Sequence, residues 1–125
     1  MSDDGEAFFR IERRGRVVLL TRTARPFDTI ADVEREYAAV VAALGRVPKA
    51  RGSLVVDLRD APPRNDPAFE DAVARLRKRM FEGFARTAVV VRTASGKLQV
   101  QRHAKDDHHA LEVFTSLEDA LTELG

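Results

Sequence analysis

The sequence predicts an α/β fold with a mixed β-sheet and helices packed against it. Three continuous apolar runs, at residues 17–20, 54–56 and 88–91, are typical of strands buried on both faces. Segments with apolar residues at helical spacing, 29–44 and 66–83, lie between these runs. Strands separated by helices can pair in parallel, with the helices covering the sheet.

The first part of the chain predicts a hairpin followed by a helix. In AFFRIERRGRVVLLTRT, apolar residues flank RRGR, where Gly15 supplies the turn. Asp28 or Thr29 can cap the helix, and Gly45 ends it. The apolar stripe expected to face the sheet is Ile30, Val33, Tyr37, Val40, Val41 and Leu44.

The middle part predicts a buried strand, SLVVDL, and a second helix over residues 66–83. Asp66 is expected at the N-cap, and Pro67 at the first helical position is a strong start signal. The buried stripe of this helix is expected to be Phe69, Val73, Leu76, Met80 and Phe84.

The last part predicts a strand at TAVVVRT, a half-exposed strand over residues 97–102, a short strand at LEVF and a terminal helix. The prediction of a strand over residues 97–102 rests on the alternation of apolar and polar residues in KLQVQR. Thr115 or Ser116 can cap the terminal helix. The predicted order is therefore β-β-α-β-α-β-β-β-α.

Composition narrows the classes of function. The 125 residues fit one domain, and the absence of cysteine excludes disulfides and thiolate chemistry. A net charge of +1 does not favour nucleic-acid binding. No apolar run predicts a membrane span, and the acidic start is unlike a signal peptide, so we expect a cytoplasmic protein.

The segments VVDLRD and VFTSLEDAL, with the order of elements from about residue 8 onward, resemble the STAS superfamily, and most of all its SpoIIAA-like, anti-sigma-factor-antagonist branch. The resemblance implies a single STAS-like domain over residues 1–125, with residues 1–6 as a disordered N-terminus. It also implies function through protein contact rather than catalysis, with an anti-sigma-factor-like or kinase-like partner, and no cofactor.

The phosphorylation switch of the signalling members does not carry over. In those proteins a serine in Asp-Ser-Ser-Gly, at the start of the helix after the central strand, is phosphorylated. Here the corresponding residues are Asn65, Asp66, Pro67 and Ala68, and no serine or threonine lies between Leu54 and Arg86. Asp66 could imitate a phosphoserine, or it could serve only as a helix cap.

The loop after the central strand is the main candidate site. Asp57 is expected to accept backbone amides of the loop, and Arg59 or Arg64 to pair with Asp57 and Asp60, rather than to form a catalytic pair. The predicted partner-contact residues are Asp57, Arg59, Asp60, Arg64, Asn65 and Asp66.

A group of basic residues and a group of histidines are two further, weaker candidates for a binding site. Arg75, Lys78 and Arg79 form a basic face on the helix over residues 66–83, either solvated or used for an acidic partner or lipid headgroups. All three histidines are gathered in HAKDDHH, at His103, His108 and His109. Their spacing matches no preformed metal motif, so a solvated turn is expected there.

The sequence thus predicts a non-enzymatic interaction and regulatory module that binds a protein partner or associates with itself as a homodimer. An alternative is a module for a small apolar, lipid-like ligand in a pocket lined by Met80, Phe81 and Phe84. A weaker alternative is a metal-dependent enzyme that uses the histidine cluster.

Overall fold

The structure is a computed structural model, and the residues that it describes are 7–47, 52–62, 67–93, 95–96, 98, 101–102 and 111–125. Five strands form one mixed sheet in the order β1-β2-β3-β4-β5. The strands are β1 Phe9–Arg14, β2 Val17–Arg22, β3 Ser53–Asp57, β4 Arg86–Val90 and β5 Glu112–Phe114. The labelled helices are α1 Ile30–Gly45, α2 Pro67–Phe81 and α4 Leu117–Leu124.

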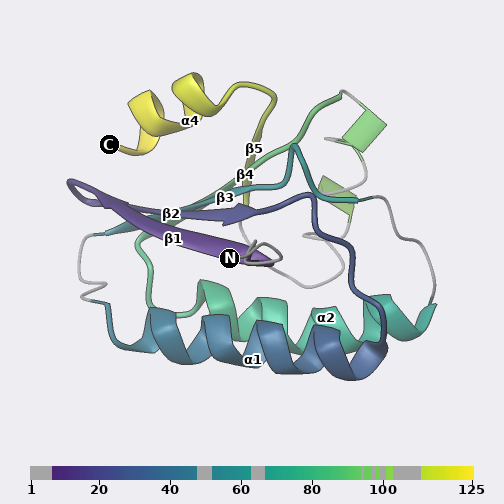
Figure 1. The fold of residues 1–125 in the computed structure, drawn as a ribbon. Coiled ribbons are helices and arrows are strands. Elements are labelled where there is room, and N and C mark those ends of the chain that lie inside the picture. The colour runs from purple at the N-terminus through teal and green to yellow at the C-terminus, as the bar shows by residue number, and fades with distance from the viewer. Residues whose placement is uncertain are drawn as a thin grey trace.

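The sheet lies between two unequal helical layers. Helices α1 and α2 lie side by side across one face, whereas the shorter α4 lies on the other (Figure 1). The β1–β2 pair is antiparallel, and the pairs from β2 to β5 are parallel. This arrangement confirms the predicted α/β class with a mixed sheet and packed helices.

Alternation along the strands divides the core into two parts, as the apolar runs predicted. The part beneath α1 and α2 contains Val18, Leu20, Leu54, Val56, Val89 and Val91. The part beneath α4 contains Val17, Leu19, Val55, Ala88 and Val90. Successive side chains of these strands point to opposite faces, and both faces are covered, so nearly every position is buried.

Local signals fix the ends of the elements. Gly15 has a φ of +62°, which suits the tight turn of the β1–β2 hairpin. The Thr29 hydroxyl accepts from Asp32 N at 3.1 Å, and the Ser116 hydroxyl accepts from Asp119 N at 3.2 Å, so these two residues are the caps of α1 and α4. Gly83, with a φ of +86°, follows the end of α2.

The strand expected over residues 97–102 is wrong. The described residues of this region, Ser95, Gly96, Leu98, Gln101 and Arg102, are helical. The Thr93 hydroxyl accepts from Gly96 N at 3.0 Å, which is a helix-start contact. Because β4 and β5 are parallel, a long crossover must join them, and a helix suits that crossover better than an added strand.

An arginine and four aromatic rings form a cluster near the end of β2 that the sequence pattern did not single out. Arg22 is only 5% exposed, and its Cζ lies 4.4 Å from the centroid of the Phe27 ring. Its Nη1 donates to Thr23 O at 2.6 Å and to Phe8 O at 3.3 Å. The rings of the cluster are Phe8, Phe9, Phe27 and Tyr37. Burial lowers the pKa of Arg22, although Tyr37 opposes the shift.

No helix among the described residues has the length and apolar character needed to cross a membrane.

Candidate functional site

The carboxyl ends of β3 and β4 form the edge of the sheet that carries the candidate site. β3 ends at Asp57, which stands beside Val90 in the register of the two strands. Leu58 N donates to Val90 O at 2.8 Å, which extends the ladder by one residue, and Ala61 N donates to Leu58 O at 3.1 Å, which closes a turn. The backbone that follows β3 is therefore held against β4 and folded back on itself.

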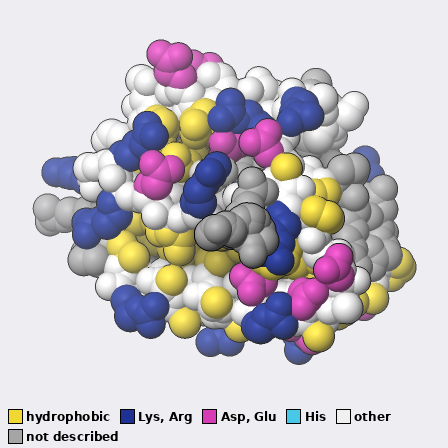
Figure 2. All heavy atoms as spheres, in the orientation of Figure 1, with side chains coloured by type: hydrophobic (Ala, Val, Ile, Leu, Met, Phe, Trp, Pro, Cys, Tyr) yellow, Lys and Arg dark blue, Asp and Glu magenta, His cyan; other side chains and the backbone are white. Residues whose placement is uncertain are grey.

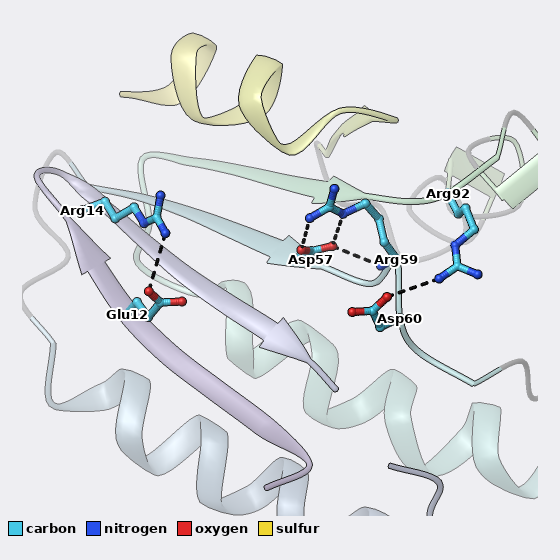
Figure 3. Close-up of polar contacts among 6 residues, drawn as sticks. All are labelled: Glu12, Arg14, Asp57, Arg59, Asp60 and Arg92. Atoms are coloured by element: carbon cyan, nitrogen blue, oxygen red, sulfur yellow. Dashed lines mark hydrogen bonds and ion pairs between the residues drawn. The ribbon is translucent and has the colours of Figure 1, made fainter. Parts of the chain in front are cut away.

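Asp57 and Arg59 form a closed pair in this loop, as Figure 3 shows. Asp57 Oδ1 accepts from Arg59 N at 3.1 Å and from Arg59 Nε at 2.9 Å, and Oδ2 accepts from Nη2 at 2.9 Å. Asp57 is only 6% exposed, whereas the Arg59 side chain is 40% exposed. A bidentate guanidinium contact of this kind is among the stronger hydrogen-bonded pairs in proteins.

The pair keeps the Asp57 carboxylate ionised. Burial by itself would raise the pKa of Asp57, but the hydrogen bonds from Arg59 outweigh this effect and lower the pKa below its ordinary value. The same contact raises the pKa of Arg59. A general acid or base needs a carboxyl group that titrates near the working pH, and Asp57 is moved away from that range.

Asp60 lies beside Arg92, a residue that the sequence reasoning missed. Arg92 Nη2 is 3.2 Å from Asp60 Oδ1, and both side chains are well exposed (Figure 3). A signal for Arg92 was present: it closely follows the AVVV run, and the ends of parallel strands meet at one edge of a sheet. The pair joins the loop after β3 to the segment after β4.

Three of the predicted contact residues, Arg64, Asn65 and Asp66, lie outside the described residues. Asp66 is also the predicted N-cap of α2, so the structure does not describe that cap. Helix α2 itself begins at Pro67, the position at which the sequence predicted its first helical residue. The described part of the site thus consists of two arginine–aspartate pairs, Asp57–Arg59 and Asp60–Arg92.

The basic residues of α2 lie on its exposed side, but acidic side chains lie among them. Arg75 Nη2 is 3.6 Å from Glu34 Oε2 of the neighbouring helix α1, and Lys78 and Arg79 are exposed. This mixture is typical of a solvated helical surface.

An open hollow lies where α2 ends and β4 and β5 begin. Its volume is about 560 Å³, and its lining residues are Phe81, Phe84, Ala85, Arg86, Thr87, Leu111 and Glu112. Of the three residues suggested for an apolar pocket, Phe81 and Phe84 are among the lining residues and Met80 is not. Met80 and Phe81 are both buried members of the core beneath α1 and α2. Arg86 and Glu112 form a short ion pair at its border, with Nη2 and Oε1 2.6 Å apart.

His103, His108 and His109 lie outside the described residues. Within the part of the chain that the structure describes, no three histidine, aspartate or glutamate side chains are gathered as a metal site requires.

Comparisons with known proteins match the fold and not the sequence. No family model and no curated protein matches the chain. One similar structure is an uncharacterised protein of the DUF3478 family with a SpoIIAA-like fold from Shewanella loihica PV-4. Its TM-score is 0.68 at 14% identity, over 94% of this chain and 92% of that one. Another is an anti-sigma factor antagonist from Mycobacterium paratuberculosis, with a TM-score of 0.57 at 19% identity, over 93% of this chain and 92% of that one.

Both matches extend over nearly the whole of each chain, and both agree with the mixed sheet and its helical layers. At this level of identity the likeness concerns the fold alone. The chain therefore has a SpoIIAA-like fold.

Proposed function

We propose that this protein is a non-enzymatic regulatory module that binds a protein partner through the loop after β3. The observation that carries the proposal is the closed Asp57–Arg59 pair beside the exposed Asp60–Arg92 pair. The first pair fixes the loop, and the second presents a charged surface in a defined position. An exposed polar surface on a rigid scaffold is suited to recognition.

The fold supports a partner of the anti-sigma-factor-like or kinase-like class. A solved structure with the same fold is an anti-sigma factor antagonist, a protein named for its opposition to another protein. Asp57 argues against catalysis at this edge of the sheet, since its carboxylate already accepts three hydrogen bonds from Arg59 and has a lowered pKa.

The test begins with affinity capture from cells that express the chain natively, followed by calorimetric titration of the captured protein. Asp60→Arg and Arg92→Glu each break the exposed pair and reverse one charge. The double variant with both changes restores an ion pair in the opposite order. Glu118→Arg, at an exposed position on α4, is the matched control for a charge reversal elsewhere.

If the loop surface binds the partner, both single variants lose affinity, the double variant does not recover it, and Glu118→Arg binds as the wild type does. Recovery in the double variant would assign the pair a structural role only. Loss of binding in Glu118→Arg alone would move the contact surface to α4 and refute the proposal.

A second candidate function is binding of a small apolar ligand in the hollow that borders Phe81 and Phe84. The observation in its favour is the group of apolar side chains, completed by Leu111, at an opening of about 560 Å³. Native mass spectrometry of freshly purified protein would report a retained ligand as added mass. Phe84→Ser should abolish such a signal and Leu98→Ser, at an exposed position, should preserve it.

A further inference from the structure

The outer edge of β1 has no partner strand among the described residues. β1 stands at one end of the strand order, and β2 pairs with its inner edge over all six residues. Ile11, in the middle of β1, is 38% exposed and is one of two exposed large hydrophobic residues in the described chain. An unpaired strand edge carries backbone N–H and C=O groups that can pair with another strand.

The hairpin determines which of these backbone groups point outward. Thr23 N donates to Phe8 O at 2.9 Å, so the backbone groups of Phe8 face β2. In an antiparallel pair the hydrogen-bonding direction alternates from residue to residue. The backbone groups of Phe9, Ile11 and Arg13 therefore face the open edge.

The same alternation limits how two copies of β1 could pair in antiparallel fashion. A residue whose backbone groups face the open edge must stand opposite a residue of the second copy whose backbone groups also face outward. Because such residues alternate along β1, the two-fold axis of the dimer must pass through a residue and not between two residues. An axis at Arg10 would place two arginines opposite each other, and an axis at Glu12 would place two glutamates opposite each other. Like charges directly opposite destabilise a strand pair.

An axis at Ile11 gives the opposite result. Arg10 then faces the partner's Glu12, and Glu12 faces the partner's Arg10, on the α4 side of the sheet. On the α1 side, Ile11 faces the partner's Ile11, and Phe9 faces the partner's Arg13. Of these three central registers, this one joins unlike charges and covers the exposed Ile11.

We propose that β1 is a self-recognition edge through which two copies of this chain form a symmetric dimer, with the two sheets joined antiparallel at Ile11. The surface is distinct from the loop after β3. The second copy is the fitting occupant because the order Arg10, Ile11, Glu12 is complementary to itself when reversed. The contact is small, so the dimer is weak and dissociates on dilution.

Figure 2 views the molecule with β1 toward the reader, and hydrophobic side chains form a band between this strand and α1. In the proposed dimer this band lies next to the same band of the second copy. Glu12 already lies 3.6 Å from Arg14 of its own chain, measured between Oε1 and Nη2, so in the dimer it stands between two guanidinium groups.

Sedimentation velocity over a wide concentration series tests the proposal with the full chain. The wild type should shift from the mass of one chain toward twice that mass as concentration rises. Arg10→Glu places two carboxylates opposite each other at each end of the contact, and should weaken dimerisation on the order of tenfold or more. The double variant R10E/E12R exchanges the two charges and should restore the dimer.

Arg16→Glu is the matched control, because it makes the same change of charge at an exposed position outside the strand. It should dimerise as the wild type does. A wild type that stays monomeric over the whole series would overturn the proposal, and the charged strand would then serve to block edge pairing. A dimer that is equally stable with Arg10→Glu would place the contact elsewhere and would also overturn it.

Discussion

Arg59 encloses the carboxylate of Asp57, two residues earlier in the chain, with two side-chain hydrogen bonds and one from its backbone N–H. The pair links the buried end of β3 to the exposed loop, because Asp57 is buried while Arg59 reaches solvent. The stability of the loop should therefore depend on a single charged contact, and that dependence can be measured.

Arg59→Ala should destabilise the protein at neutral pH by about 1–3 kcal/mol, because it leaves the Asp57 carboxylate buried without its cation. The lowered pKa of Asp57 fixes the pH dependence. The contribution of the ionised Asp57 to stability is fully present above its unfolded pKa of about 3.9. It is lost as the pH falls through the lower pKa that Asp57 has in the folded protein.

Urea unfolding of wild type and Arg59→Ala at neutral and acid pH checks this prediction. The difference in unfolding free energy should be largest at neutral pH and should shrink below about pH 4. A difference that is the same at every pH would show that Arg59 acts through packing alone.

Val55→Ala and Val90→Ala should each cost about 1–3 kcal/mol, because both side chains are fully buried in central strands beneath α4. Leu98→Ala is the control, since Leu98 is 64% exposed and should change stability by less than about 0.5 kcal/mol. Chemical denaturation of the three variants gives the comparison. Equal effects at buried and exposed positions would contradict the packing of the sheet.

Arg22→Lys should lower the free energy of unfolding by about 1–3 kcal/mol, although it keeps the positive charge. A lysine ammonium lacks the planar group that lies against the Phe27 ring, and burial disfavours its charged form. Thermal or urea unfolding measures the loss. An Arg22→Lys variant as stable as the wild type would mean that the aromatic contacts contribute little.

Asp66 remains a sequence-based prediction, although Pro67 does begin α2. As an N-cap, Asp66→Ala should cost about 0.5–2 kcal/mol, whereas Asp66→Ser should keep most of the stability. If the charge imitates a phosphoserine, the serine variant should stay folded but change its affinity for the partner. An Asp66→Ala variant with unchanged stability would remove the cap from the account of this loop.

The histidine cluster should bind no metal tightly. Equilibrium dialysis with zinc, cobalt and nickel is expected to show no stoichiometric binding tighter than about millimolar, far weaker than a structural zinc site. Submicromolar binding that is lost in His103→Ala or His108→Ala would contradict this expectation and would favour the metal-dependent enzyme.

Much of the fold could be predicted because its strands are buried on both faces. Runs such as Val17–Leu20 and Ala88–Val91 are apolar at successive positions, a pattern that directly reflects their surroundings. The strand predicted over residues 97–102 was wrong because this segment lacks such a run of apolar residues. With few apolar residues, the alternation in KLQVQR carried too little information to distinguish a strand from a helix.

The candidate site was predictable where its contacts are local. Asp57 and Arg59 are two residues apart, so Arg59 was one of the two arginines, with Arg64, that the sequence offered as partners for the loop aspartates. Arg92 lies 32 residues from Asp60 along the chain, and only the parallel pairing of β3 with β4 brings the two together.

The sequence by itself determined the buried strands, the two long helices, the hairpin turn at Gly15 and the absence of a phosphorylatable serine after β3. These features depend on neighbours in the chain, through periodicity, capping and turn geometry. Only the tertiary structure decided the strand order, the open edge of β1 and the burial of Arg22 among aromatic rings. These features depend on which distant segments pack together, and local periodicity does not encode that choice.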